Sequence, residues 1–401
     1  MTTTRLYEDW SGNVVTTATV RNLDPEALRA VRATFEGRYP ERIEESRTWD
    51  DETFLTKVGV FKRGKVTNAA LVLLGKSGDR VLPPSVCIRW RLLDTDGRLV
   101  DSRVYDGPSS LTVRQAVSMI RNPSCRVRSG DRTREVGTYR TATLIEAVNN
   151  AVLHQDYSLG GTVDIVERES ESVTVISRGA FPDVRPEAFV TGRVSLPQSR
   201  NPFLAKAMVS LGLVPGNGSG IRGMYLSQAF RHFPMPTYST LDGTVSVTFS
   251  GIRGGAYAHA LDNREDMDIE MIMDLDRLAK NLYVHPKRLE ALERRGIVSR
   301  VDGVPCIVVG WGPGTVSRFT KGSDTEAVED LMADVGSVTR ADVVAILRAR
   351  DSKGLTDEQL SVKATNLLQS MRRSGRIRKA EGSTRSARYV PGESARKTCD
   401  E

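Results

Sequence analysis

Hydrophobic positions in the first part of Thr141–Gly161 recur at steps of three and four residues and predict an amphipathic helix. A polar row, Glu146, Asn150 and His154, runs beside this stripe at a spacing of four. Because residues four apart lie one turn above each other, the three side chains project from one face. The pattern fits either a solvated polar face or a site where a carboxylate, an amide and an imidazole meet a ligand. The apolar stripe consists of Leu144, Ala147, Val148, Ala151 and Val152.

The surrounding sequence alternates between strand and helix patterns. A hairpin is predicted within Val86–Tyr105 around the turn at Asp94–Gly97, and a basic loop is predicted at Arg121–Arg134. Helix and strand patterns together indicate an α/β (α+β) chain. Helices are expected at Asp24–Thr34, Leu111–Ile120 and Arg200–Leu213, paired strands at Val163–Val166 and Ser172–Ile176, and a closing strand at Thr244–Phe249.

The stretch Ala70–Ser77 satisfies a loose A-x-x-x-x-G-K-S pattern. A phosphate-cradling loop needs small, flexible residues whose backbone amides curl round the anion. Leu71–Leu74 is instead a continuous apolar run, so we expect a buried helix end or strand here.

From Asp262 onward, small helical units alternate with basic hairpins. Pro286–Arg295 is predicted as a helix with proline in its first turn, followed by a hairpin at Ile297–Val309. A larger copy of this plan follows: three helices and a two-stranded wing, the arrangement of a winged helix. Its elements are expected at Glu326–Ala333, Arg340–Arg348, a capping-box helix from Thr356 to Arg373, and Arg376–Tyr389.

Basic side chains gather on the third helix and wing of this module. Between Ser361 and Val390 the only acid is Glu381. This density suits contacts to DNA phosphates, whereas a protein-contact module with a merely solvated basic face is the alternative. The predicted DNA-binding residues are Lys363, Arg372, Arg373, Arg376, Arg378, Arg385 and Arg388.

Composition sets wider limits. The 401 residues carry a net charge of +7, which is compatible with nucleic acid as a partner without requiring it. No apolar run is long enough to span a bilayer, and the first residues lack the layout of a signal peptide. The four cysteines are scattered without a C-x-x-C pair. We therefore expect a cytoplasmic protein with reduced thiols and no membrane partner.

Glu146-x-x-x-Asn150 resembles the N box of GHKL (Bergerat-fold) ATPases. The longer run E-A-V-N-N-A-V-L-H-Q-D-Y-S resembles a narrower group, the bacterial AlbA/Schlafen-like "RecG-like" ATP-binding proteins. Three further stretches agree with that group in the same order: Thr67–Lys76, Arg200–Val214 and Gly216–Ile221. The resemblance covers roughly residues 45–250 and implies an ATP-binding α/β sandwich.

In this family the N-box glutamate polarises the attacking water and the asparagine holds Mg²⁺. The resemblance thus implies Glu146 as the catalytic base, Asn150 as the metal ligand, and ATP and Mg²⁺ as cofactors. By this resemblance, Gly216–Gly223 corresponds to the lid over the triphosphate. Several glycines before a helix also leave backbone amides free to face a phosphate. The alternative is that this segment is only a tight connection between two helices. The implied nucleotide-binding residues are Asn149, Asn150, His154, Asp156, Gly179, Gly216, Gly218, Ser219 and Gly220.

The chain departs from the GHKL pattern at Ile176–Ala180. The family has an aspartate there that accepts a hydrogen bond from the adenine amino group, and this sequence has none. Gly179 still permits a close backbone approach to a ligand. We expect base selectivity to be altered and hydrolysis to be slow.

Four segments are expected: an N-terminal α/β segment (residues 1–135), the GHKL-like core (136–255), a winged-helix-like unit (262–312) and a winged helix (324–392). Family members usually begin with an AlbA-like DNA-binding domain, so a separate AlbA-like or effector subunit is an expected partner, as is homo-oligomerisation. The sequence favours a nucleotide-responsive, DNA-associated transcriptional regulator. The alternatives are a slow ATPase subunit of a DNA-repair or anti-phage complex, and a degenerate ATPase domain that serves as an interaction scaffold.

Overall fold

The computed structural model divides the chain into two compact units, each built from both helices and strands. The first comprises Met1–Pro123, Gly137–Ser227 and Pro236–Gly251, and the second comprises the remaining segments. The fold is α+β with a mixed sheet, which agrees with the fold class expected from the sequence. The structure describes residues 9–81, 86–129, 132–181, 184–192, 194, 199–216, 218–253, 255–262, 267–301, 304–308, 323–335, 337–350, 354–380 and 387–392.

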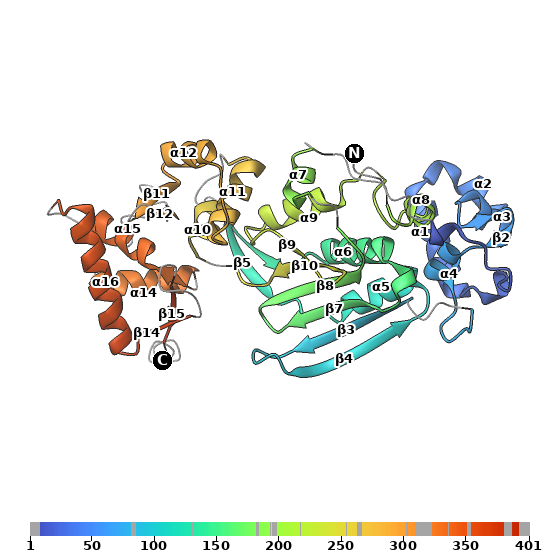
Figure 1. Ribbon diagram of the computed structural model, residues 1–401, viewed down its shortest axis with the longest axis horizontal. Coiled ribbons are helices and arrows are strands. Elements are labelled where there is room, and N and C mark those ends of the chain that lie inside the picture. Colours follow the sequence, from blue (N-terminus) through green and yellow to red (C-terminus); the bar gives the residue numbers. More distant parts are fainter. Residues whose placement is uncertain are drawn as a thin grey trace. The chain divides into compact units, whose positions relative to one another are not determined.

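A six-stranded sheet in the order β4-β3-β7-β8-β10-β9 organises the first unit (Figure 1). Strands β3 and β7 are parallel and the other neighbours are antiparallel. The predicted hairpin and paired strands are confirmed. The strands are β3 (Cys87–Leu93), β4 (Leu99–Asp106), β7 (Val163–Arg168), β8 (Ser172–Arg178), β9 (Thr237–Leu241) and β10 (Thr244–Ser250).

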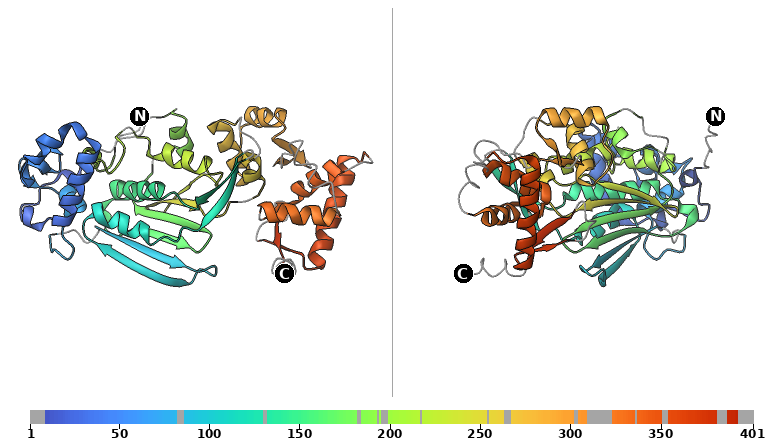
Figure 2. Two further views of the ribbon diagram at one scale, coloured as in Figure 1. Left: turned by 180° about the vertical axis from the view of Figure 1, so that it is seen from behind. Right: turned by 60° about the vertical axis from the view of Figure 1, so that its left-hand side comes forward.

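Helices α5 (Ser109–Ser118) and α6 (Thr141–His154) cover one face of this sheet (Figures 1 and 2). The alternation along β3 explains why: Ile88, Trp90 and Leu92 are buried, whereas the residues between them are only partly buried. The apolar stripe of α6 is buried as its periodicity predicts.

The N-terminal segment forms a cluster of short helices. Asp24 caps α1 by accepting hydrogen bonds from the amides of Glu26 (2.8 Å) and Ala27 (2.9 Å), with Pro25 in the first turn, as the sequence predicts. Its elements are η1 (Trp10–Gly12), η2 (Val20–Asn22), α1 (Pro25–Arg38), η3 (Pro40–Arg42), α2 (Ile43–Arg47), α3 (Asp51–Lys57), β1 (Phe61–Lys62), β2 (Lys65–Val66) and α4 (Asn68–Leu74).

The P-loop-like stretch is a buried helix end, one of the two structures expected for it. All of α4 after Asn68 is buried. Lys76 donates to the Arg21 carbonyl (2.6 Å) and Ser77 to Asp106 (2.8 Å), so both side chains serve the fold.

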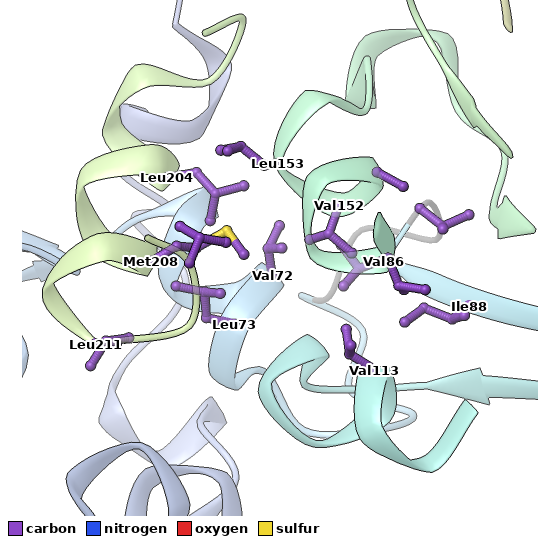
Figure 3. Packing of buried hydrophobic residues seen from close by; sticks show 14 of the residues in the cluster. Val72, Leu73, Val86, Ile88, Val113, Val152, Leu153, Leu204, Met208 and Leu211 are labelled. Carbon is purple, nitrogen blue, oxygen red and sulfur yellow. The ribbon is translucent and has the colours of Figure 1, made fainter. Parts of the chain in front are cut away.

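One apolar core joins α4, α6 and α8 (Pro202–Ser210) with β3 and α5. In Figure 3, Leu204 and Met208 of α8 lie beside Leu73 of α4, with Val152 of α6 on the other side of α4. The first unit also contains η4 (Tyr157–Leu159), α7 (Pro186–Val190) and most of α9 (Gly220–Ala229).

The second unit contains a strand pair where a basic loop was predicted. That prediction was wrong: β5 (Ser124–Ser129) pairs with β6 (Arg132–Gly137). Alternating arginines hide the strand signal, yet Val127 between them is buried. The pair is followed by α10 (Gly255–Asp262), α11 (Ile269–Ala279), α12 (Pro286–Arg294), β11 (Val298–Val301) and β12 (Val304–Ile307).

The last part of the second unit has three helices and a three-stranded antiparallel sheet in the order β13-β15-β14. A capping box starts α16, as predicted, because Thr356 and Gln359 satisfy each other's amides. Strand β13 was not predicted. The elements are α14 (Asp324–Val335), β13 (Val338–Thr339), α15 (Arg340–Arg350), α16 (Asp357–Arg373), β14 (Ile377–Lys379) and β15 (Arg388–Pro391). Of the helices in the described ranges, none has the length and apolar content needed to cross a membrane.

Candidate functional site

The polar row of α6 forms a contact between two of its members. Asn150 Nδ2 donates a hydrogen bond to Glu146 Oε1 at 3.3 Å. Both side chains are half-buried, whereas His154 is exposed in the last turn. Burial raises the pKa of the Glu146 carboxyl, and the Asn150 hydrogen bond partly opposes this shift.

Gly220, the first residue of α9, lies directly against this pair. A Cβ at Gly220 would be 2.5 Å from Glu146 Oε1 and 3.1 Å from Asn150 Nδ2. A side chain at Gly223, one turn later, would meet nothing within 4 Å. A side chain at position 220 would therefore displace the Glu146 carboxylate, at the point where the glycine-rich segment becomes a helix.

The other glycines of this segment have backbone roles. A Cβ at Gly216 would be 2.8 Å from Val209 Cγ1. Gly218 has a φ of +66°, a backbone conformation that residues with a side chain rarely adopt. The Ser219 carbonyl accepts from the Gly223 amide at 2.7 Å and so starts α9.

Gly179 lies at the other end of α6. Its φ is +140°, and a Cβ there would be 3.2 Å from the His154 carbonyl oxygen. The Asp156 amide donates to the Arg178 carbonyl at 2.9 Å, which holds this turn against the end of α6. The predicted close approach at Gly179 is thus made to the protein backbone.

Two predicted site residues, one on α6 and one just after it, make contacts within the fold. Asn149 is buried and donates to the Leu213 carbonyl at 2.9 Å. Asp156 pairs with Arg200 at 2.5 Å and accepts the amide of Ser158.

Asn201 was not singled out from the sequence. It is buried and donates to the carbonyls of Leu153 (2.8 Å) and Gln155 (2.9 Å), which satisfies two acceptors where α6 ends. The sequence feature that could have pointed to Asn201 is its position in R-N-P-F, the first four residues of the Arg200–Val214 stretch that agrees with the family.

A cavity of about 290 Å³ opens beside the Asp156–Arg200 pair. His154, where α6 ends, is eight residues beyond Glu146, which is about 12 Å along the helix. The cavity is therefore distinct from the Glu146–Gly220 contact. Its lining residues are Trp10, Asn13, Asp156, Tyr157, Ser158, Arg200 and Asn201.

An aromatic group is within range of the charge of Glu146. Burial raises the pKa of the Tyr238 hydroxyl on β9, and the charge of Glu146 adds to the shift. The Tyr238 ring packs on Phe181 with centroids 5.2 Å apart, and Phe181 packs on Phe189 at 6.2 Å. This interaction could not be predicted from the sequence, because β9 is far from α6 along the chain.

The basic residues of the second unit fall into two groups. Lys363 pairs with Asp324 at 2.8 Å and Arg376 with Glu329 at 2.9 Å. Arg388 donates to the Ala279 carbonyl at 3.4 Å. By contrast, Arg372, Arg373 and Arg378 are exposed, and no ion pair joins any of them to another described residue; Arg385 lies outside the described residues.

The donor set around Glu146 is compatible with Mg²⁺. In the described part of the chain, no group of three or more His, Cys, Asp or Glu side chains is arranged to hold a metal ion. Mg²⁺ does not need one, because it keeps several waters and takes one or two protein oxygens plus phosphate oxygens. The Asn150 amide, the Glu146 carboxylate and the side-chain-free position at Gly220 fit a magnesium–phosphate group.

Comparisons with known proteins identify the fold and leave the activity open. Residues 2–83 match a family model described as a domain of unknown function (DUF8451). No curated protein matches the chain. The fold is similar to that of the DIP2311 protein from Corynebacterium diphtheriae, known from a crystal structure: the TM-score is 0.52 and the identity 20%, over 96% of this chain and 70% of that one. At this identity the similarity concerns the fold alone.

Proposed function

We propose that the first unit binds a magnesium–nucleotide complex, with ATP as the nucleotide, between α6 and the start of α9 in the manner of a GHKL-like α/β sandwich. The observation that carries the proposal is the contact of Gly220 with the Glu146–Asn150 pair. A carboxylate and an amide one helical turn apart meet a helix N-terminus, where free amides and the helix dipole favour a phosphate.

Each residue then has a defined task. The Asn150 side-chain oxygen ligates Mg²⁺, which would offset phosphate charge. The amides at the start of α9 bind phosphate oxygens. Glu146, whose pKa is raised by burial, accepts a proton from the attacking water. Because the adenine-binding aspartate is absent, we expect altered base selectivity and slow hydrolysis.

We further propose that the last part of the second unit is a winged helix that binds DNA. Its element order and its β13-β15-β14 sheet fit that plan. Arg372 and Arg373 at the end of α16 and Arg378 on β14 supply exposed positive charge for phosphates. Together the two proposals describe a nucleotide-responsive, DNA-associated regulator. A slow ATPase subunit of a repair or anti-phage complex is the second candidate, because Glu146 beside the start of α9 is positioned to act as a base.

Calorimetric titration with ATP, with and without Mg²⁺, tests the nucleotide site. Asn150→Ala should abolish Mg²⁺-dependent binding while the thermal melt stays unchanged. Asn366→Ala, an exposed asparagine of α16, is the matched control and should bind like the wild type. Equal affinity in both variants would refute the site, and no binding by the wild type would favour an interaction scaffold.

A further inference from the structure

The six-stranded sheet ends at β4, which exposes an unusual amount of apolar surface. Leu99, Val100 and Val104 are 59%, 54% and 61% exposed. Strand β4 lies at the edge of the sheet in Figure 1, with β3 on one side only. An edge strand of this length presents a row of backbone groups that another strand can pair with.

The sequence of β4 is self-complementary about Ser102. It reads Leu-Val-Asp-Ser-Arg-Val-Tyr over residues 99–105. In an antiparallel pair of two copies related by a twofold axis at Ser102, Asp101 faces Arg103 twice and Val100 faces Val104 twice. A twofold interface needs this property, since the same strand must be its own partner.

The faces of the strand agree with this pairing. Asp101 and Arg103 are in register with Leu92 and Trp90 of β3, so both lie on one face of the sheet. Ser102 and Val104 are in register with Arg91 and Arg89 and lie on the other face, whereas Val100 lies at a bulge, where the register shifts between Leu92 and Leu93. One face therefore receives the ion pairs between the two copies, and the other receives the Val104 side chains.

The backbone at the twofold centre points the right way. The Ser102 amide donates to the Asp101 side chain (Oδ1) at 2.7 Å, so this amide is directed away from β3. Both backbone groups of one residue in an antiparallel ladder face the same neighbour. Ser102 and Val104 can thus present their backbone groups to a second copy, up to the bulge at Val100.

We propose that the chain forms a homodimer in which β4 pairs antiparallel with β4 of a second copy, joining the two sheets into one. Asp101 leaves the Ser102 amide and pairs with Arg103 of the other copy. Charges that only keep an edge strand from aggregating would not need this mirrored order.

A charge-swap series on the full chain, measured by sedimentation equilibrium, tests the proposal. The wild type should dimerise. Asp101→Arg and Arg103→Asp should each weaken the dimer by about tenfold or more, because each places like charges opposite each other at two points. The double variant D101R/R103D should restore dimerisation. Leu241→Lys, on the opposite edge strand β9, is the control and should have no effect.

The outcomes separate cleanly. A wild type that stays monomeric, or single variants that dimerise as well as the wild type, would overturn the proposal. Loss of dimer in L241K alone would place the interface at β9 and also overturn it. Failure of the double variant to recover, with a native circular dichroism melt, would show that charge pairing does not hold the two strands together.

Discussion

The substitution Gly220→Ala isolates the contact on which the nucleotide site depends. The new Cβ would be 2.5 Å from Glu146 Oε1, whereas ordinary contact begins at 3.4 Å. The carboxylate must therefore move by roughly 1 Å, which a flexible side chain can do by rotation without unfolding the protein. Alanine also favours a helix over glycine by up to about 1 kcal/mol, so the melting temperature should hold or rise slightly.

The same movement should be costly for function. Misplacing a positioned group by about 1 Å costs on the order of a hundredfold in rate. We expect Gly220→Ala to lower turnover of Mg·ATP by about that factor and to weaken Mg²⁺-dependent binding, because Asn150 Nδ2 is also close, at 3.1 Å from the new atom.

Gly223→Ala is the matched control for this experiment. It makes the same chemical change in the same helix, with open space around the new atom. It should match the wild type in a coupled ATPase assay and in calorimetry. If the two variants have equal activity, the contact between Gly220 and Glu146 has no part in the function.

Three further predictions concern charge. Glu146→Gln should keep nucleotide binding and lose hydrolysis by about a hundredfold or more. Because burial raises the pKa of Glu146, turnover by the wild type should fall on acidification at a higher pH than an ordinary glutamate would give. A pH–rate profile of the wild type and the variant checks both expectations. Burial raises the pKa of Asp342 from its ordinary 3.8 to about 6, so the folded state loses stability as pH rises through that window. Asp342→Asn should stabilise the chain by on the order of 2–3 kcal/mol at pH 7.5 and not at pH 4, measured by urea unfolding; equal effects at both pH values would contradict this reasoning. Replacing Arg372 and Arg378 with Gln should flatten the salt dependence of DNA binding by about two units of log–log slope. Arg376→Gln should change the slope less, because Arg376 already pairs with Glu329. A gel-shift salt titration in which Arg376→Gln changes the slope as much as the double replacement would refute the assignment.

The sequence by itself determined the local elements. The cap of α1 at Asp24, the capping box of α16 and the apolar stripe of α6 depend on residues within a few positions of each other, so their patterns are legible in the chain. The hairpin of β3 and β4 follows from alternation and a turn for the same reason.

Only the tertiary structure decided what the polar residues of α6 touch. Glu146 meets Gly220 across more than seventy positions, and Asn149 donates to Leu213. Asp156, expected near a nucleotide, is held by Arg200. Spacing on a helix fixes which side chains share a face, but burial and partners are set by which distant segment packs on that face. The short strand β13 likewise forms only because β15 offers it a partner.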